Sequence, residues 1–249
     1  YHADLVASSL YSVVHEGGHA LYELHVGREL SRTCLGGGVS MAIHESQSRF
    51  YENIIGRSRA FCGVIYPWLR EHFAPRLDDV SQDAFYRMIN KAQPSLIRTE
   101  ADELTYCLHI MVRYELERRM FAGELTAHDL PAEWNRLYKA YLGVDVPNDR
   151  EGVLQDSHWA GGSIGYFPSY AIGSAYGAQY LRQMQKDFDV FESVRSGRLT
   201  RINGWLEDKI WKYGCMKDPT PLFESVCGPF DPTCYTAYLR DKFTEVYGL

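Results

Sequence analysis

The pentapeptide His15-Glu16-Gly17-Gly18-His19 is the feature that most restricts the fold of this 249-residue chain. It lies within a stretch from Ala3 to Val26 whose apolar residues recur every three or four positions, as in an amphipathic helix. Histidines four residues apart on a helix project from one face, so both imidazoles can bind one ion. The pattern therefore predicts a metal-binding helix, with Glu16 as the base that acts on water.

The same stretch predicts how this helix packs. We expect its apolar residues to face the core, opposite the histidines: Val6, Leu10, Val13, Val14, Leu21 and Leu24. Each glycine inside a helix costs about 1 kcal/mol relative to alanine. Gly17 and Gly18 therefore indicate that something approaches the helix closely.

The remaining pattern is mostly helical and lacks alternating strand patterns longer than a few residues, so the predicted class is all-α. A small β-hairpin around Cys34 to Ile43 is the one exception that we consider. The class that we expect is an all-α fold, with the H-E-x-x-H helix and a second helix that supplies a glutamate ligand. Further helices are expected at about 46–68, 81–92, 104–122, from 130 onward, and at 171–185, 199–213 and 235–247.

A third metal ligand is needed, and four residues are candidates. His25 has the spacing of metzincin endopeptidases, but Tyr22 stands where those enzymes have the glycine that breaks the helix. A continued helix would place His25 about 9 Å further along the axis than His19. Glu23 is displaced along the axis too. Glu45 opens a second helix after a glycine-rich connection and would complete a His2Glu set, with Glu52 as its nearest competitor.

Composition excludes several functions. The net charge of −6 offers no basic surface for nucleic acid, and no window is apolar enough to span a membrane. The six cysteines form no C-x-x-C pair, so we expect free thiols and a cytoplasmic protein.

Four motifs in order carry a resemblance to a known family. These are His15-Glu16-x-x-His19, His44-Glu45-Ser46, Ile97-Arg98-x-x-Ala101-Asp102 and Gly152-x-x-Gln155-Asp156-x-His158-Trp159. The chain resembles the carboxypeptidase Taq family of zinc metallocarboxypeptidases. One departure is small: Gln47 directly follows Ser46, where the family has its glutamine one position later. Two upstream family motifs, H-P-F and D-x-R-x-T, are absent, so residues 1–249 are expected to be the C-terminal catalytic part of a longer protein.

The resemblance implies a function and a set of roles. It implies a cytosolic homodimer that removes C-terminal residues from peptides, with Zn²⁺ or the similar Co²⁺ held by His15, His19 and Glu45. Glu16 would be general base and then general acid. The alternatives are a metzincin-like endopeptidase and an inactive metal-binding fragment that needs its missing half.

The last two motifs would bind substrate. Arg98 would grip the substrate's terminal carboxylate, or else form a surface ion pair with Asp102, which would orient Arg98 or cap the fold. His158 would donate to the oxyanion, with Gln155 and Asp156 orienting it, or would simply pack in the core. The phenol of Tyr166 or Tyr170 would donate a hydrogen bond to the tetrahedral intermediate, and we prefer Tyr166.

Overall fold

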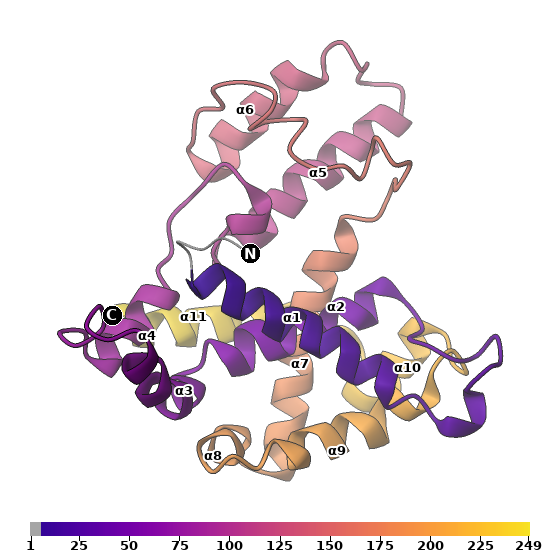
Figure 1. Cartoon of the computed structure of the whole chain (residues 1–249). Helices are drawn as coiled ribbons and strands as arrows, with labels where there is room; N and C mark the ends of the chain where they lie inside the picture. Colours follow the sequence, from indigo (N-terminus) through magenta and orange to yellow (C-terminus); the bar gives the residue numbers. More distant parts are fainter. Residues whose placement is uncertain (1–5) are drawn as a thin grey trace. The chain divides into compact units, whose positions relative to one another are not determined.

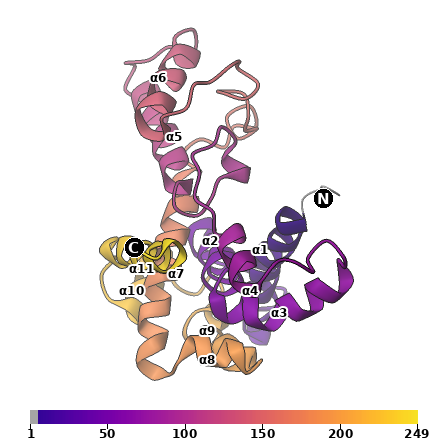
Figure 2. The ribbon, with the colours of Figure 1, turned by 90° about the vertical axis from the view of Figure 1, so that its left-hand side faces the viewer.

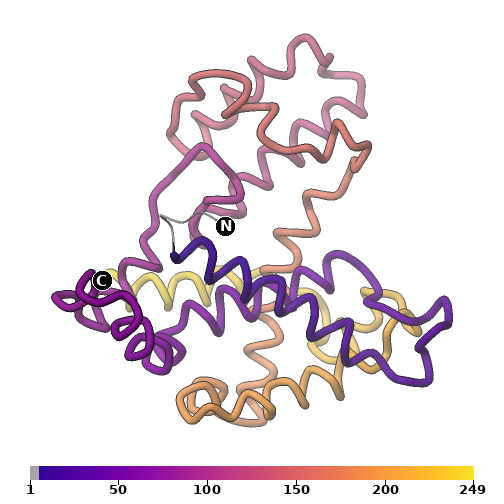
Figure 3. The backbone as a smooth tube through the Cα atoms, viewed as in Figure 1, coloured from indigo at the N-terminus to yellow at the C-terminus, as the bar shows by residue number. Residues whose placement is uncertain are grey.

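The structure, a computed structural model, describes residues 6–249, where the chain forms eleven α-helices and no strand (Figure 1). The predicted all-α class is therefore confirmed. Residues 3–5 of the first expected helix lie outside the described residues. The chain divides into two compact units, and Figure 3 traces the backbone through both. Unit 1 comprises the residues up to Asn90 and Ile172–Leu249, and unit 2 comprises Lys91–Ala171.

Unit 1 contains most of the helices. Serines at positions 40, 58 and 81 cap α2, α3 and α4, each accepting a hydrogen bond from the backbone N–H three residues on. The division between the units falls in the first turn of α7, after Ala171. The helices are α1 (Val6–Leu24), α2 (Met41–Arg49), α3 (Arg59–His72), α4 (Gln82–Ile89), α7 (Pro168–Asp187), α8 (Val190–Arg195), α9 (Leu199–Lys209), α10 (Pro219–Cys227) and α11 (Thr233–Tyr247).

Helix α2 lies between α1 and α7, and glycines allow both contacts (Figure 2). A Cβ added to Gly18 of α1 would lie 2.6 Å from the Cα of Ser48 and 2.7 Å from the carbonyl oxygen of Gln47. A Cβ on Gly173 of α7 would lie 2.5 Å from the Cβ of Glu45. The expected close approach is thus found at Gly18, whereas a Cβ at Gly17 would meet open space.

The predicted core face of α1 is only partly correct: Leu10, Val14 and Leu21 are half-buried, but the other three residues are exposed. Val13 and Leu24 are 71% and 78% exposed, and Val6 is exposed as well. The buried residues of α1 are Tyr11, Gly18 and Tyr22. The glycine contact with α2 decides which side of the helix is covered, and it favours the side beside the histidines.

The hairpin considered for residues 34–43 is not formed. A short 3₁₀ helix (Arg28–Leu30) and a series of turns lead from α1 to the capping Ser40. Leu35 accepts a backbone hydrogen bond from Cys215, far along the chain, rather than from a neighbouring strand. Gly37 adopts a positive φ of 96°, which a strand does not allow.

Several helix boundaries differ from those expected. The single helix predicted at 46–68 is the end of α2, a π-helical segment (Phe50–Gly56) and α3, which continues through Pro67. Helices α8 and α10 were not predicted. Pro219 occupies the first turn of α10, where backbone N–H groups have no acceptor within the helix, so the missing N–H of proline costs no hydrogen bond.

Unit 2 is built on α5 (Tyr106–Phe121) and α6 (Leu130–Leu142), preceded by a 3₁₀ turn (Arg98–Glu100) and followed by an irregular segment up to α7. Val112 and Leu116 of α5 pack against Trp134, Leu137 and Tyr138 of α6. The irregular segment is tied to α5 through Glu117, which accepts hydrogen bonds from the Trp159 indole and the Gly165 N–H.

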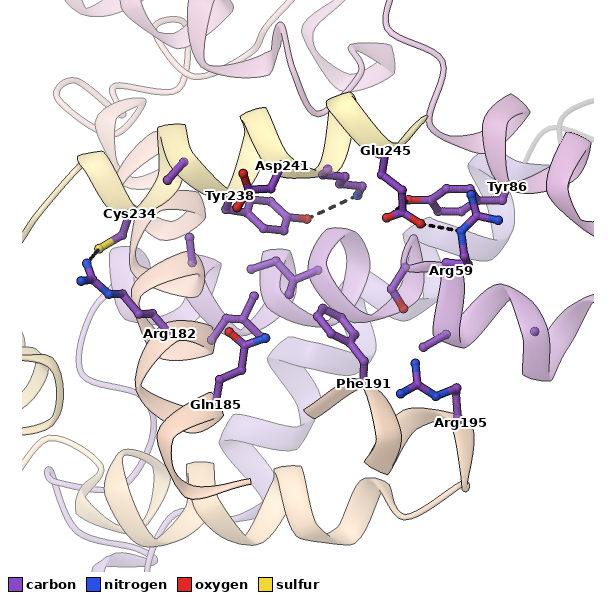
Figure 4. Close-up of a pocket in the computed structure, with 18 of the residues that line it drawn as sticks. Arg59, Tyr86, Arg182, Gln185, Phe191, Arg195, Cys234, Tyr238, Asp241 and Glu245 are labelled. Atoms are coloured by element: carbon purple, nitrogen blue, oxygen red, sulfur yellow. Dashed lines mark hydrogen bonds and ion pairs between the residues drawn. The ribbon is translucent and has the colours of Figure 1, made fainter. Parts of the chain in front are cut away.

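Unit 1 also contains a cavity of about 820 Å³ between α3, α7, α8 and α11 (Figure 4). Arg59 donates to Glu245 at one side, and Arg182 donates to the Cys234 sulfur at the other. The predicted site residues do not line this cavity.

Two further expectations can be compared with the structure. All six cysteines are free, as expected. Among residues 6–249, each helix is too short or too polar to cross a membrane.

The contact at Gly18 predicts the effect of two neighbouring substitutions. Gly18→Ala should destabilise the protein by about 1–3 kcal/mol, because the new methyl group would overlap the backbone of α2. Gly17→Ala is the matched control and should stabilise by up to about 1 kcal/mol, because it adds helix propensity in open space. Urea unfolding of the three proteins measures both effects, and equal stabilities would contradict the proposed close contact.

Candidate metal centre

Three side chains of unit 1 converge as the sequence predicts. His15 and His19 come from α1 and Glu45 from α2, and one ligand atom of each lies within 4.8 Å of the others. His15 Nε2 lies 3.6 Å from Glu45 Oε2, and His19 Nε2 lies 3.7 Å from Glu45 Oε1. Ligands at the usual zinc distances in a tetrahedron are about 3.3 Å apart. The donor set and its spacing therefore fit a zinc ion.

Glu45 is held rigidly. Its residue is only 3% exposed, and Ser48 Oγ donates to its Oε2 over 3.0 Å. The backbone of α7 at Gly173 packs directly against it. A carboxylate fixed in this way needs little reordering to bind a cation.

The second ring nitrogen of His15 has a carboxylate partner. His15 Nδ1 lies 2.9 Å from Glu52 Oε2, on the π-helical segment that follows α2. Although burial alone would raise the pKa of Glu52, the charges of Arg49 and Arg57 and the hydrogen bond from His15 lower it to about 2. Glu52, the competitor for third ligand, thus binds the outer side of His15 and is absent from the converging group.

His19 is held by a longer chain of contacts. Its Nδ1 lies 3.1 Å from His44 Nδ1, and His44 Nε2 lies 2.7 Å from Glu23 Oε1. Burial lowers the pKa of His19, which favours the neutral imidazole that a metal requires. No role for His44 was expected from the sequence, although this residue stands directly before Glu45 in the second motif.

His25 lies apart from the three ligands. Its Nδ1 is 2.7 Å from the carbonyl oxygen of Leu21, and its ring packs against Trp211. It does not belong to the converging group of described residues. Glu16 is an exposed residue of α1, between the two ligand histidines.

In unit 2, the residues of the last two motifs form a buried ionic cluster. Arg98 donates from Nε and Nη2 to Asp156, and Arg113 of α5 donates to the same carboxylate from Nε over 2.7 Å. Arg98 is 6% exposed and Arg113 is fully buried. Although burial raises the pKa of Asp156, the hydrogen bonds and charges of Arg98 and Arg113 outweigh it and lower that pKa.

The neighbours of this cluster are polar and aromatic. Gln155 Oε1 accepts from the Arg98 backbone N–H and from Arg113 Nη2, so Gln155 and Asp156 orient the two arginines. Arg98 Nη1 donates to the Tyr106 hydroxyl, and the Arg98 guanidinium lies over the Tyr170 ring.

His158 lies at the edge of the cluster. Its Nε2 is 2.9 Å from the Tyr170 hydroxyl, and its Nδ1 is 4.0 Å from Asp156. Burial, followed by the charge of Arg98, lowers the pKa of His158. The Tyr166 ring packs against those of His158 and Tyr170.

Asp102 has the contacts of a cap. Its carboxylate accepts hydrogen bonds from the backbone N–H groups of Thr105 and Gln93 and from the Thr105 hydroxyl. This arrangement agrees with the structural alternative of the sequence analysis, and its predicted role in substrate binding stays a prediction.

Sequence reasoning missed Arg113 and Tyr106. A signal was present: positions 106, 109, 110, 113, 116 and 117 fall on one face of α5 and are all buried. Charged residues on such a face indicate buried partners.

Comparison with known proteins identifies the family. Residues 1–243 match the family model described as carboxypeptidase Taq (M32) metallopeptidase. The chain belongs to this family. It is 43% identical over 242 residues to carboxypeptidase 1 of Bacillus subtilis, covering 96% of this chain and 48% of that protein. It is 43% identical to thermostable carboxypeptidase 1 of Pyrococcus furiosus, covering 94% of this chain and 47% of that protein.

A solved structure agrees. The crystal structure of the M32 carboxypeptidase from Deinococcus radiodurans R1 superimposes with a TM-score of 0.93 at 42% identity, over 96% of this chain and 49% of that one. The chain thus spans about half the length of the relatives that it matches.

The geometry predicts which residue is the third ligand. Glu45→Gln should weaken zinc binding by more than the about 10- to 100-fold that loss of an outer partner causes, because it removes a ligand charge. His25→Ala should leave the zinc affinity unchanged, because His25 lies outside the converging group. Competition with a chromophoric chelator measures both, and the reverse order of effects would favour the metzincin-like arrangement.

The cluster in unit 2 predicts a pH-dependent stability. Asp156→Asn should cost about 3–5 kcal/mol at pH 7, because it leaves two buried guanidinium groups without their carboxylate. The stability that Asp156 contributes is complete above the usual pKa of 3.8 and is lost as the pH falls below it, because the folded-state pKa is lowered.

Urea unfolding between pH 7 and pH 2 checks this prediction. The difference in the free energy of unfolding between wild type and Asp156→Asn should become smaller as the pH falls below 3.8. Asp145→Asn, at an exposed ion pair of the same unit, is the matched control and should cost less than about 1 kcal/mol. A difference that persists unchanged at pH 2 would rule out the ionised carboxylate as its cause.

Proposed function

We propose that this chain is the catalytic part of a zinc-dependent metallocarboxypeptidase that removes C-terminal amino acids from peptides. The convergence of His15, His19 and Glu45 beside Glu16 carries the proposal. Family membership supports it, since the relatives are named carboxypeptidases and the family is described as metallopeptidases. In keeping with the resemblance, we place the protein in the cytoplasm as a homodimer.

The metal would be held by His15, His19 and Glu45. When bound, zinc supplies Lewis acidity, polarising the scissile carbonyl and lowering the pKa of water to about 7. Co²⁺ suits the same ligands. Glu16 takes the proton of the attacking water and passes it to the nitrogen of the leaving amino acid as the C–N bond breaks.

The residues of unit 2 would recognise the substrate. Two guanidinium groups share one carboxylate there, so the cluster of Arg98, Arg113 and Asp156 keeps a net positive charge. That charge favours the free carboxylate of a peptide C-terminus. Gln155 and Asp156 position Arg98, while His158, Tyr166 and Tyr170 supply donors for the peptide carbonyl. Asp102 contributes indirectly, because its carboxylate accepts hydrogen bonds from Thr105 and so fixes the backbone that follows Arg98.

Activity on matched peptides tests the proposal. A peptide with a free C-terminus should be trimmed with a kcat/KM about 10- to 100-fold higher than its C-terminal amide, because a charge-assisted hydrogen bond is worth about 1.5–3 kcal/mol. Mass spectrometry of the products, with zinc content determined on the same sample, gives both results. Equal cleavage of the amide, at internal bonds, would favour an endopeptidase.

Glu16→Gln is the matched variant for catalysis. It should keep its zinc and lose about 10²- to 10⁴-fold in kcat, because only the general base is removed. Bound zinc without any turnover in the wild type would instead favour a fragment that needs the rest of its longer relatives.

A further inference from the structure

The two ligand histidines are held from behind by different partners. His15 Nδ1 faces the carboxylate of Glu52, and His19 Nδ1 faces the ring of His44, which in turn faces Glu23. These three partners lie outside the group that could hold the metal. Their contacts nevertheless determine which nitrogen of each ligand ring carries the proton.

The assignment of protons follows from the acceptors. A carboxylate only accepts, so the Glu52 contact places the His15 proton on Nδ1 and leaves the Nε2 lone pair toward Glu45. In the same way, Glu23 draws the proton of a neutral His44 to Nε2, so that His44 Nδ1 accepts. His19 then donates from Nδ1, and its Nε2 lone pair also faces Glu45.

The connection between α1 and α2 is shaped around His44. A Cβ at Gly38 would overlap the His44 ring and lie 2.7 Å from the Tyr22 ring. The N–H of Gly38 donates to Glu23 Oε1, the atom that His44 contacts, and the N–H of Val39 donates to the Tyr22 hydroxyl. Glu23 thus joins the loop and the His44 ring through one oxygen.

We propose that His44, oriented by Glu23 and the glycine at position 38, and Glu52 are the positioning residues of the metal centre, each fixing the tautomer and ring angle of one ligand histidine. This inference rests on the metal site of the proposed function. Outer partners of this kind typically contribute about 10- to 100-fold in metal affinity. His44 and Glu52 therefore act through His19 and His15, outside the converging ligand group.

Zinc affinity and a Co²⁺ spectrum test the inference on the full chain. After removal of metal, competition with a chromophoric chelator gives the zinc Kd of wild type, His44→Ala, Glu23→Ala and Glu52→Ala. We expect each variant to bind zinc about 10- to 100-fold more weakly. We also expect the visible absorption of the Co²⁺-loaded His44→Ala protein to change, since a rotated ligand ring alters the coordination geometry.

Matched variants separate positioning from folding. His72→Ala removes an exposed helix-end histidine and should leave the zinc Kd unchanged. Gly17→Ala, in open space, should do the same, whereas Gly38→Ala should weaken binding by displacing the His44 ring. His44→Gln, which keeps a donor and an acceptor, should recover part of the affinity. If His44→Ala fails to fold, Glu23→Ala decides, because the Glu23 side chain is half exposed.

The outcomes are distinct. Zinc binding by the wild type, with weaker binding and an altered Co²⁺ spectrum in the variants, supports the assignment. Unchanged Kd values in His44→Ala and Glu23→Ala overturn it for His19, and an unchanged Kd in Glu52→Ala overturns it for His15, while the metal site stands. A wild type that binds no zinc overturns the proposed function and this inference together.

Discussion

The direct contact between α1 and α2 at Gly18 determines the geometry of the metal centre. Gly18 stands one residue before His19, and it meets the backbone of α2 at Gln47 and Ser48, just after Glu45. A side chain there would move the two helices apart, and with them the histidines from the carboxylate. Gly173 repeats the arrangement on the other side of α2, where α7 touches Glu45 itself. These glycines lower the helix propensity of α1 and α7, but they allow the close helix contacts that place the three ligand side chains together.

Unit 2 depends on a different kind of constraint. One carboxylate, Asp156, is shared by two buried guanidinium groups, and a neighbouring amide and a phenol accept further hydrogen bonds from them. His109 lies in this environment with its pKa lowered to about 3, by burial first and then by the charge of Arg113. Ion pairs with Asp156 therefore attach the irregular segment to the rest of unit 2, whereas α5 and α6 pack against each other through apolar side chains.

The sequence was informative about local structure and less so about burial. Helical periodicity predicted the all-α class and the approximate positions of α4 and α6, because periodicity depends on neighbouring residues alone. The order of motifs predicted the Glu45 side chain that meets both histidines. Periodicity did not show which face of α1 is covered, since that depends on Gly18 meeting a distant backbone. The pairing of Arg98 with Asp156, 58 residues apart, also needed the fold.

The π-helical segment after α2 makes one short stretch of chain intolerant to changes in length. Glu45 lies before it and Glu52 within it, yet both carboxylates reach the same imidazole, one at each nitrogen. A deletion at position 50 or 51 would bring Glu52 one residue closer to α2 and change its direction around the helix axis. It would carry Glu52 away from His15 and leave Glu45 in place. Homologous sequences should therefore differ in the types of residue between Glu45 and Glu52 far more often than in how many residues separate them.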